Sequence, residues 1–215
     1  MIPLVHDFRG ETVLVVGGGP VGARKARRFA DEARTVVVSP EFAEGAFGDA
    51  ELVRAAVTVD DADDWVARFD PALVVAATND SEVNDALVAA ARDHGALVNR
   101  ADRSGERDVG SVVVPATIED GDVAVAITTG GASPALSKYL RERIEAELAG
   151  AGEMAELTGE LRAELKDSNR TPAERRDAIR AVVRDPSVWK ALRSGDTNPR
   201  REAARVIRTT ENEDA

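Results

Sequence analysis

Residues 12–22 read Thr12-Val13-Leu14-Val15-Val16-Gly17-Gly18-Gly19-Pro20-Val21-Gly22, and this stretch decides the fold. Such an apolar run is typical of a parallel strand buried on both faces. The glycines match G-x-G-x-x-G at Gly17, Gly19 and Gly22, and residues 21–33 read as a helix. In this motif the glycines permit a tight turn, admit a pyrophosphate and let helix and strand pack closely. The stretch predicts a dinucleotide-binding turn; the alternative is a glycine-rich turn without a ligand.

Further apolar runs alternate with helical segments down to Asp102. We expect strands at residues 35–38, 73–77 and 96–99, and a short strand at 52–53 or 57–59 within a poorly defined connection. Ser81 is a plausible N-cap for a helix that ends near His94. Strands that alternate with helices imply right-handed βαβ units. The predicted fold class is therefore α/β, with a Rossmann-like, doubly wound parallel sheet.

The pattern changes after Asp102. Apolar segments at residues 112–114 and 123–128 read as a pair of strands, and Ser133-Pro134 can start a helix that runs to about Leu148. The rest reads as helical, with a capping box expected at Thr171. We predict a Rossmann domain at residues 1–111, a small α/β segment at 112–148 and a helical C-terminal domain at 149–215.

Composition excludes several kinds of chemistry. The chain has no cysteine and two histidines, so redox chemistry requires a bound cofactor and no metal site is expected. The net charge of −11 disfavours nucleic acid as a partner, and the presence of only four lysines suggests adaptation to high salt. No apolar run is long enough to span a membrane, and the N-terminus lacks the features of a secretory signal. A cytoplasmic location is the expectation.

The acidic residue that usually holds the ribose at the end of the second strand is missing. Val38 is followed by Ser39-Pro40, with Glu41 one position further. Ser39, backbone groups or Glu41 could hold the ribose instead. Arg24 or Arg34 could hold a 2′-phosphate, so the choice between NAD and NADP stays open.

Several motifs together resemble the precorrin-2 dehydrogenase family, which includes the N-terminal module of siroheme synthase. The resemblance covers roughly residues 1–148. The most distinctive of its motifs is the glycine-rich segment at residues 128–136, which occurs in few other protein families. The motifs are Pro3-Leu4, Val15-Val16-Gly17-Gly18-Gly19, Arg24-Lys25-Ala26, Pro40-Glu41-Phe42, Ala76-Ala77-Thr78-Asn79-Asp80 with Asn84, Val98-Asn99 leading to Asp102, and Thr128-Thr129-Gly130-Gly131-Ala132-Ser133-Pro134-Ala135-Leu136.

The resemblance implies NAD-dependent oxidation of precorrin-2 to sirohydrochlorin in siroheme biosynthesis. It also implies a homodimer formed through residues 112–148, with the tetrapyrrole in a cleft between subunits. The family's catalytic aspartate falls on Asp102. Its cofactor contacts fall on four residues, Pro20, Val21, Pro40 and Glu41. Thr78 and Asn79 join them because they follow a strand at the edge where open α/β sheets place ligands.

Asp102 is also the best catalytic candidate from its own position. It follows the carboxyl end of a predicted strand, and a carboxylate base suits a reaction that removes a hydride and protons. The alternative is a loop cap or an ion pair with Arg100 or Arg103.

A second anion site is possible at Thr129, Gly130 and Ser133, ahead of a helix N-terminus. A substrate carboxylate could bind there, although an ordinary strand-to-helix turn with Ser133 as N-cap explains the pattern equally well. Arg103 and Arg107 could pair with other carboxylates of the substrate.

Two other functions remain open from the sequence. One is a bifunctional enzyme that also inserts iron or cobalt into sirohydrochlorin, because Asp102 could serve both reactions. The other is a non-catalytic NAD-sensing module, which would share the glycine motif but has no reason to carry residues 129–134 or the long C-terminal helices.

Overall fold

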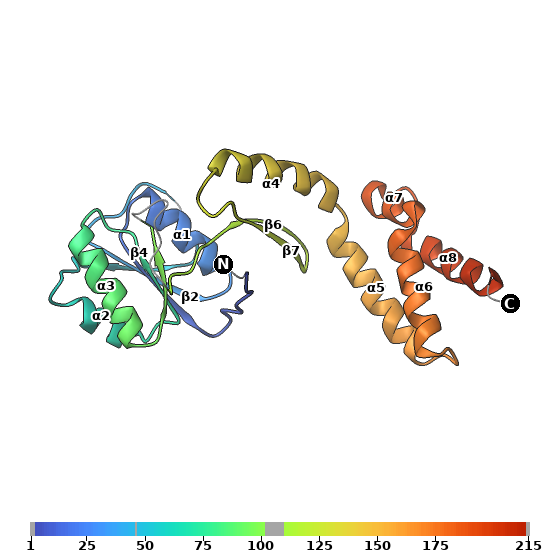
Figure 1. Ribbon diagram of the computed structural model, residues 1–215, viewed down its shortest axis with the longest axis horizontal. Coiled ribbons are helices and arrows are strands. Elements are labelled where there is room, and N and C mark those ends of the chain that lie inside the picture. Colours follow the sequence, from blue (N-terminus) through green and yellow to red (C-terminus); the bar gives the residue numbers. More distant parts are fainter. Residues whose placement is uncertain (1–2, 46, 102–109, 214–215) are drawn as a thin grey trace. The chain divides into compact units, whose positions relative to one another are not determined.

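The computed structural model describes residues 3–45, 47–101 and 110–213. The chain forms two compact units, Met1–Val114 and Pro115–Ala215 (Figure 1). The first unit is built on a parallel sheet in the order β3-β2-β1-β4-β5, and this order reverses between β1 and β4. Its strands are β1 (Thr12–Val16), β2 (Arg34–Ser39), β3 (Glu51–Arg54), β4 (Leu73–Ala76) and β5 (Leu97–Arg100). The predicted Rossmann-like fold class is confirmed.

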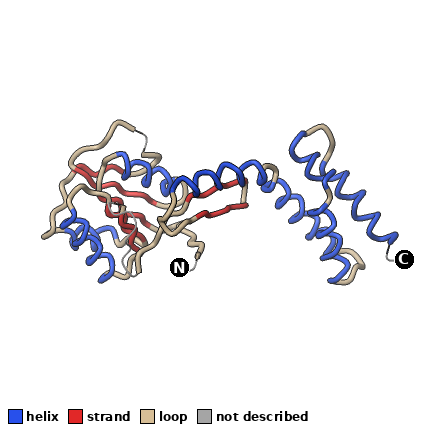
Figure 2. Tube along the Cα trace, turned by 45° about the horizontal axis from the view of Figure 1, so that its top comes forward, coloured by secondary structure: helices blue, strands red, loops and turns tan. Residues whose placement is uncertain are grey.

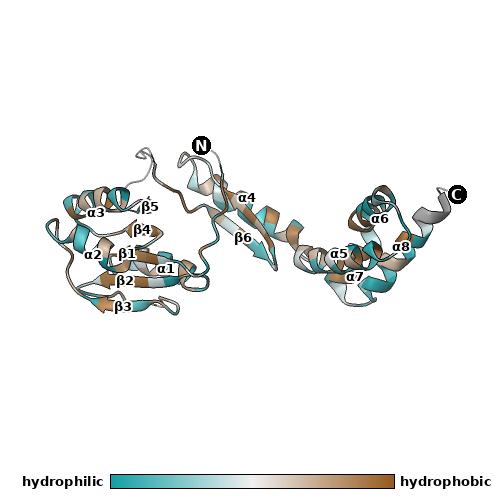
Figure 3. Cartoon of the chain, turned by 90° about the horizontal axis from the view of Figure 1, so that it is seen from below, coloured by the Kyte–Doolittle hydropathy of each residue, from teal (hydrophilic) through white to brown (hydrophobic). Residues whose placement is uncertain are grey.

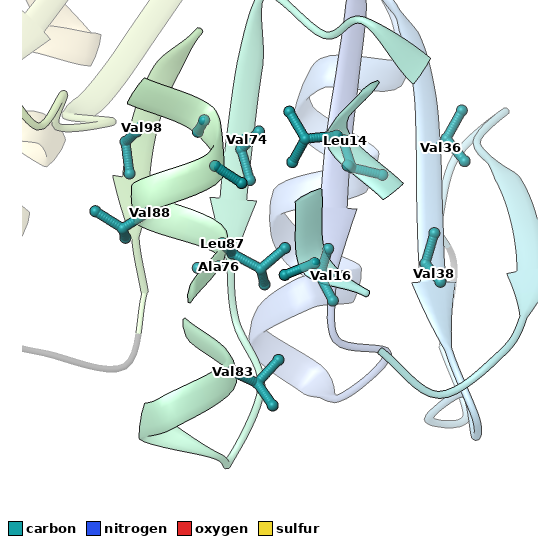
Figure 4. Packing of buried hydrophobic residues seen from close by; sticks show 14 residues of the cluster. Leu14, Val16, Val36, Val38, Val74, Ala76, Val83, Leu87, Val88 and Val98 are labelled. Atoms are coloured by element: carbon teal, nitrogen blue, oxygen red, sulfur yellow. The ribbon is translucent and has the colours of Figure 1, made fainter. Parts of the chain in front are cut away.

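Helices cover both faces of this sheet, which is why its central strands are mostly apolar (Figure 3). Helix α1 (Pro20–Ala30) packs through Ala26 and Phe29 against the face that carries Val13 and Val15. Helices α2 (Ala62–Phe69) and α3 (Ser81–Asp93) cover the opposite face, where Leu87 packs against Val16 and its neighbours (Figure 4). Alternate residues of β1 thus enter two separate cores.

Three sequence predictions for this unit need correction. Helix α1 spans residues 20–30 rather than 21–33, because the chain turns away where Glu32 N and Ala33 N both donate to the carbonyl of Phe29. Helix α2 was not predicted, because eight residues give too few turns for a clear periodicity. The N-cap of α3 is Asp80 rather than Ser81, since the Asp80 carboxylate accepts from Glu82 N at 2.9 Å and from Val83 N at 3.3 Å.

The second unit begins with an antiparallel pair, β6 (Ala116–Asp120) and β7 (Val123–Ile127). The prediction of a strand at residues 112–114 was wrong. Those residues are apolar because Val112 and Val114 pack against the α1 side of the first core, and Val112 N donates to Val98 O at 2.7 Å. Helix α4 (Pro134–Leu148) lies along the pair (Figures 1 and 2), and none of its side chains is buried.

The remaining helices are α5 (Ala151–Lys166), α6 (Pro172–Arg184), α7 (Pro186–Ser194) and α8 (Pro199–Glu213). They share one apolar core that includes Leu161, Val182 and Val188. The predicted capping box at Thr171 is confirmed: its backbone N–H donates to Glu174 at 2.6 Å, and hydrogen bonds from Thr171 lower the pKa of the Glu174 carboxyl. Within the described parts of the chain, no helix is both long and apolar enough to cross a membrane.

Candidate functional site

A crevice of about 560 Å³ lies at the carboxyl ends of β1, β2 and β4. Parallel sheets place ligands at this edge, where the strand order reverses. Six of the predicted cofactor residues line it, namely Gly17, Gly19, Pro40, Glu41, Thr78 and Asn79. Pro20, Val21 and Gly22 form the first turn of α1 directly after Gly19. Segments that are distant in the sequence, around Gly17, Pro40 and Thr78, therefore meet at one site.

The glycine turn has one open position. A Cβ atom on Gly17 would lie 2.4 Å from Ala77 O, and one on Gly22 would lie 1.9 Å from Gly17 O. A Cβ on Gly18 would meet Glu41 O at 2.2 Å, whereas one on Gly19 would meet nothing within 4 Å. Gly17, Gly18 and Gly22 are therefore required by the packing of the protein itself. Only Gly19 faces free space.

The space beside Gly19 suits a diphosphate. Gly19 is the N-cap of α1, and no side chain caps this helix end. The first turn of a helix presents N–H groups and a partial positive charge to an anion. The backbone can approach a ligand closely here because Gly19 has no side chain. The residues present thus fit the diphosphate of a dinucleotide.

The end of β2 has no carboxylate at the usual ribose position, which Ser39 occupies. Arg34 lies at the opposite end of β2 and pairs with Glu51 at 2.9 Å, so it does not reach the crevice. No sequence motif marks Arg54, which pairs in register with Ser39 from β3. Its Nη1 donates to Pro40 O at 2.9 Å, and its guanidinium lies 5.4 Å from the centre of the Phe42 ring. Arg54 is therefore the arginine held beside this end of the crevice.

The turn after β4 is held by a buried amide. Asn84, on α3, is fully buried, and its Oδ1 accepts from Thr78 N at 3.2 Å and from Thr78 Oγ1 at 2.8 Å. Its Nδ2 donates to Thr78 O at 3.0 Å. Both backbone groups of Thr78 are thus satisfied by one side chain. Asn84 belongs to a motif quoted above, and the structure assigns it a positioning role.

Replacing Asn84 with alanine is expected to destabilise the first unit by about 1–3 kcal/mol, because buried backbone groups of Thr78 lose their partners. NAD affinity should fall as well, since Thr78 lines the crevice. Urea unfolding and NAD titration measure the two effects. Glu82→Ala is the matched control, because Glu82 is exposed on the same turn of α3. Equal stability of the two variants would contradict the role given to Asn84.

The edge of the sheet at β5 carries a second buried amide. Asn99 is 6% exposed, and its Nδ2 donates to Val112 O at 2.8 Å. Arg100, one of the proposed partners of Asp102, pairs with Asp85. Asp102, Arg103 and Arg107 lie outside the described residues.

In the second unit, hydroxyl groups already bind the N–H groups of the glycine-rich turn. Ser133 N donates to Thr129 Oγ1 at 3.2 Å, Gly130 N donates to Thr128 Oγ1 at 3.2 Å, and Leu136 N donates to Ser133 Oγ at 3.3 Å. The N-cap expected at Ser133 is therefore present. These bonds support the structural interpretation of the turn, and anion binding at Thr129, Gly130 and Ser133 stays a prediction.

The sheet order, the glycine turn and the crevice together define a Rossmann-type dinucleotide-binding protein. Residues 4–116 match the family model described as putative NAD(P)-binding, and residues 120–147 match the one described as sirohaem biosynthesis protein central. The chain belongs to the precorrin-2 dehydrogenase family. It is 35% identical over 198 residues to precorrin-2 dehydrogenase of Methanosarcina barkeri, an alignment that covers 89% of this chain and 86% of that one.

Other relatives agree with this assignment. Siroheme synthase 1 of Aeromonas salmonicida is 36% identical over 91% of this chain and 41% of its own length. The chain thus spans about two fifths of the siroheme synthases that it matches. The solved structure of SirC, a precorrin-2 dehydrogenase, matches with a TM-score of 0.68 at 26% identity and covers 97% of this chain and 100% of that one. The resemblance noted in the sequence is therefore confirmed.

Proposed function

We propose that the chain oxidises precorrin-2 to sirohydrochlorin with NAD, as a step of siroheme biosynthesis. The observation that carries this proposal is the open position at Gly19 beside the N-terminus of α1, in a chain of the precorrin-2 dehydrogenase family. A glycine turn without a ligand would have no reason to keep that space free, and a non-catalytic NAD-sensing module would have no reason to match the second family model, at residues 120–147.

Each wall of the crevice has a distinct task in this proposal. Gly19 with the N–H groups of Val21 and Gly22 holds the diphosphate, and Ser39, Pro40 and Glu41 hold the ribose at the end of β2. Thr78 and Asn79 line the end of β4 and would hold the nicotinamide there. NAD, when bound, would supply the hydride acceptor. The carboxylate of Asp102 accepts a proton released from the tetrapyrrole in the same oxidation.

The direct test adds precorrin-2 and NAD to the purified chain and follows NADH by its absorbance. We expect NADH to appear with the substrate and to stop forming once the substrate is consumed. A folded chain that binds NAD and yields no NADH would contradict the proposal. A circular dichroism spectrum confirms the fold of the sample.

The cofactor preference should be modest, because Ser39 replaces the carboxylate that would otherwise repel the 2′-phosphate of NADP, and Arg54 lies beside Ser39. Removing its charge with Arg54→Gln is expected to weaken NADP binding by about twofold to fivefold, the effect of an exposed ion pair of up to about 1 kcal/mol, and to leave NAD binding unchanged. Arg34→Gln is the matched control, since it removes the same charge at the far end of β2. Isothermal titration with both nucleotides measures the difference. Equal loss of both nucleotides in Arg54→Gln would refute this assignment.

We further propose that residues 112–148 form the interface of a homodimer. Helix α4 supports this, because Leu136 is 46% exposed and Tyr139 is 53% exposed on a helix with no buried side chain. The third apolar position, Leu140, continues the same stripe at helical spacing. Analytical ultracentrifugation of the intact chain tests the assembly, and a monomer at all concentrations would rule it out.

A further inference from the structure

Helices α5 and α6 form an antiparallel pair (Figure 1). An open groove of about 670 Å³ is lined by side chains of these two helices. Six basic residues line this α5–α6 groove, and no carboxylate does so within the described residues. The chain as a whole carries a net charge of −11. A basic groove is therefore the opposite of what the average surface of this protein offers. Its basic residues are Arg162, Lys166, Arg175, Arg176, Arg180 and Arg184.

The basic residues converge because of helical spacing. Arg176, Arg180 and Arg184 are four residues apart on α6, so they form a row with about 6 Å between neighbours. Arg162 and Lys166 have the same spacing on α5. Like charges at this spacing repel one another, and opposite charges attract. The row on α6 is thus mildly unfavourable unless an anion lies against it.

Nearby carboxylates are engaged elsewhere. Glu160 and Glu164 on α5 both bind Arg200 on α8, and Glu174 closes the capping box with Thr171. The exception is Asp177, which pairs with Arg180 of the groove at 2.9 Å. Three of the groove's arginines, Arg162, Arg176 and Arg184, have no hydrogen bond or ion pair with any described part of the chain. On α4, by contrast, Arg141 pairs with Glu145 one turn away at 3.0 Å.

The floor of the groove is apolar. Ile179 is buried, Pro172 lies at the start of α6, and Val183 is 40% exposed although it is a large aliphatic residue. A simple inorganic anion would leave these apolar side chains exposed to water. A ligand that satisfies both features has a flat apolar body with several carboxylates at its edge.

We propose that the α5–α6 groove binds a polycarboxylated tetrapyrrole at a second site, separate from the crevice of the first unit. This inference rests on the proposed function, which supplies such a molecule as substrate and product. The guanidinium groups of the α6 arginines bind the carboxylates at the edge of the tetrapyrrole, and Ile179 and Val183 contact its ring. The groove thereby binds the product, sirohydrochlorin, on the helical unit after precorrin-2 has been oxidised.

Equilibrium dialysis of the intact chain with sirohydrochlorin tests the site. We expect two molecules bound per chain in the wild type, and one in the double variant Arg176→Gln/Arg184→Gln. The control, Arg201→Gln/Arg208→Gln, removes two exposed arginines of α8 and should still bind two. Citrate serves as a polycarboxylate without an apolar body, and it should not compete at equal concentration. Circular dichroism checks that each variant is folded.

The outcomes separate this proposal from the proposed function. An unchanged count of two in the groove variant, or competition by citrate as strong as that by sirohydrochlorin itself, would overturn the second site. NADH formation from precorrin-2 by the wild-type chain is measured independently. The wild-type chain could form no NADH while the groove variant still binds one sirohydrochlorin fewer than the wild type. That result would support the second site and refute the proposed oxidation.

Discussion

Replacing Asp102 with asparagine is expected to lower kcat for precorrin-2 oxidation by about 10²- to 10⁴-fold, which is the usual contribution of a positioned general base. Asparagine keeps the size and shape of the side chain but cannot accept the proton at neutral pH. The dissociation constant for NAD should stay within about twofold of the wild-type value, because the crevice proposed for the cofactor is lined by the ends of β1, β2 and β4. Stopped-flow NADH formation and an NAD titration measure the two quantities.

The matched control is Asp93→Asn, which removes an exposed carboxylate near the end of α3, on the segment that leads to β5. It should retain full activity. If Asp102→Asn also retained full activity, Asp102 would be a structural residue of its loop, and the base would have to be sought among other residues. A parallel loss of NAD binding would instead indicate that the variant disturbs the crevice.

Much of the first unit could be predicted because its signals are local. An apolar run such as residues 12–16 must be buried on both faces, and a glycine such as Gly22 is needed wherever a helix touches the preceding strand. Both features act within a few residues of sequence. Helix α2 escaped prediction because its eight residues carry two buried side chains, Ala62 and Val66, and the helix packs mainly against α3.

The apolar residues at 112–114 misled the prediction for a related reason. Val112 and Val114 have the composition of a strand, but they gain their burial by packing against the α1 side of the first core. Sequence pattern shows that a residue is buried and not which partner buries it. The partner strand of β7 is the less apolar segment Ala116–Asp120, whose Glu119 and Asp120 give little strand signal.

The candidate site likewise combines features that local sequence predicts with features that depend on tertiary packing. The glycine turn and the residues after β2 and β4 follow from the rule that ligands bind at the carboxyl edge of parallel strands. The role of Arg54 depends instead on the register of β3 against β2, which places it beside Ser39. No motif marks that register. Likewise, Arg34 could be removed from the site only when its pairing with Glu51 at the opposite end of the strand was known.

Gly22 and Gly19 should respond differently to the same added methyl group. The change at Gly22 should lower stability, and the change at Gly19 should lower only NAD affinity. Gly22→Ala is expected to destabilise the first unit by about 1–3 kcal/mol or more, because its Cβ would lie 1.9 Å from Gly17 O and a backbone carbonyl cannot rotate away. For a unit of this size that loss lowers the midpoint of thermal unfolding by at least about 4 °C. Weaker NAD binding would follow from the distorted turn.

Gly19→Ala should leave stability unchanged, since a Cβ there meets nothing within 4 Å and its φ of −73° suits alanine. Its NAD affinity should nevertheless fall by at least about tenfold, because the methyl group occupies the space through which the diphosphate approaches the helix. Thermal unfolding and NAD titration of both variants separate the effects. If a stable Gly19→Ala chain bound NAD as tightly as the wild type, the diphosphate would lie elsewhere, because a methyl group in its path would otherwise weaken binding.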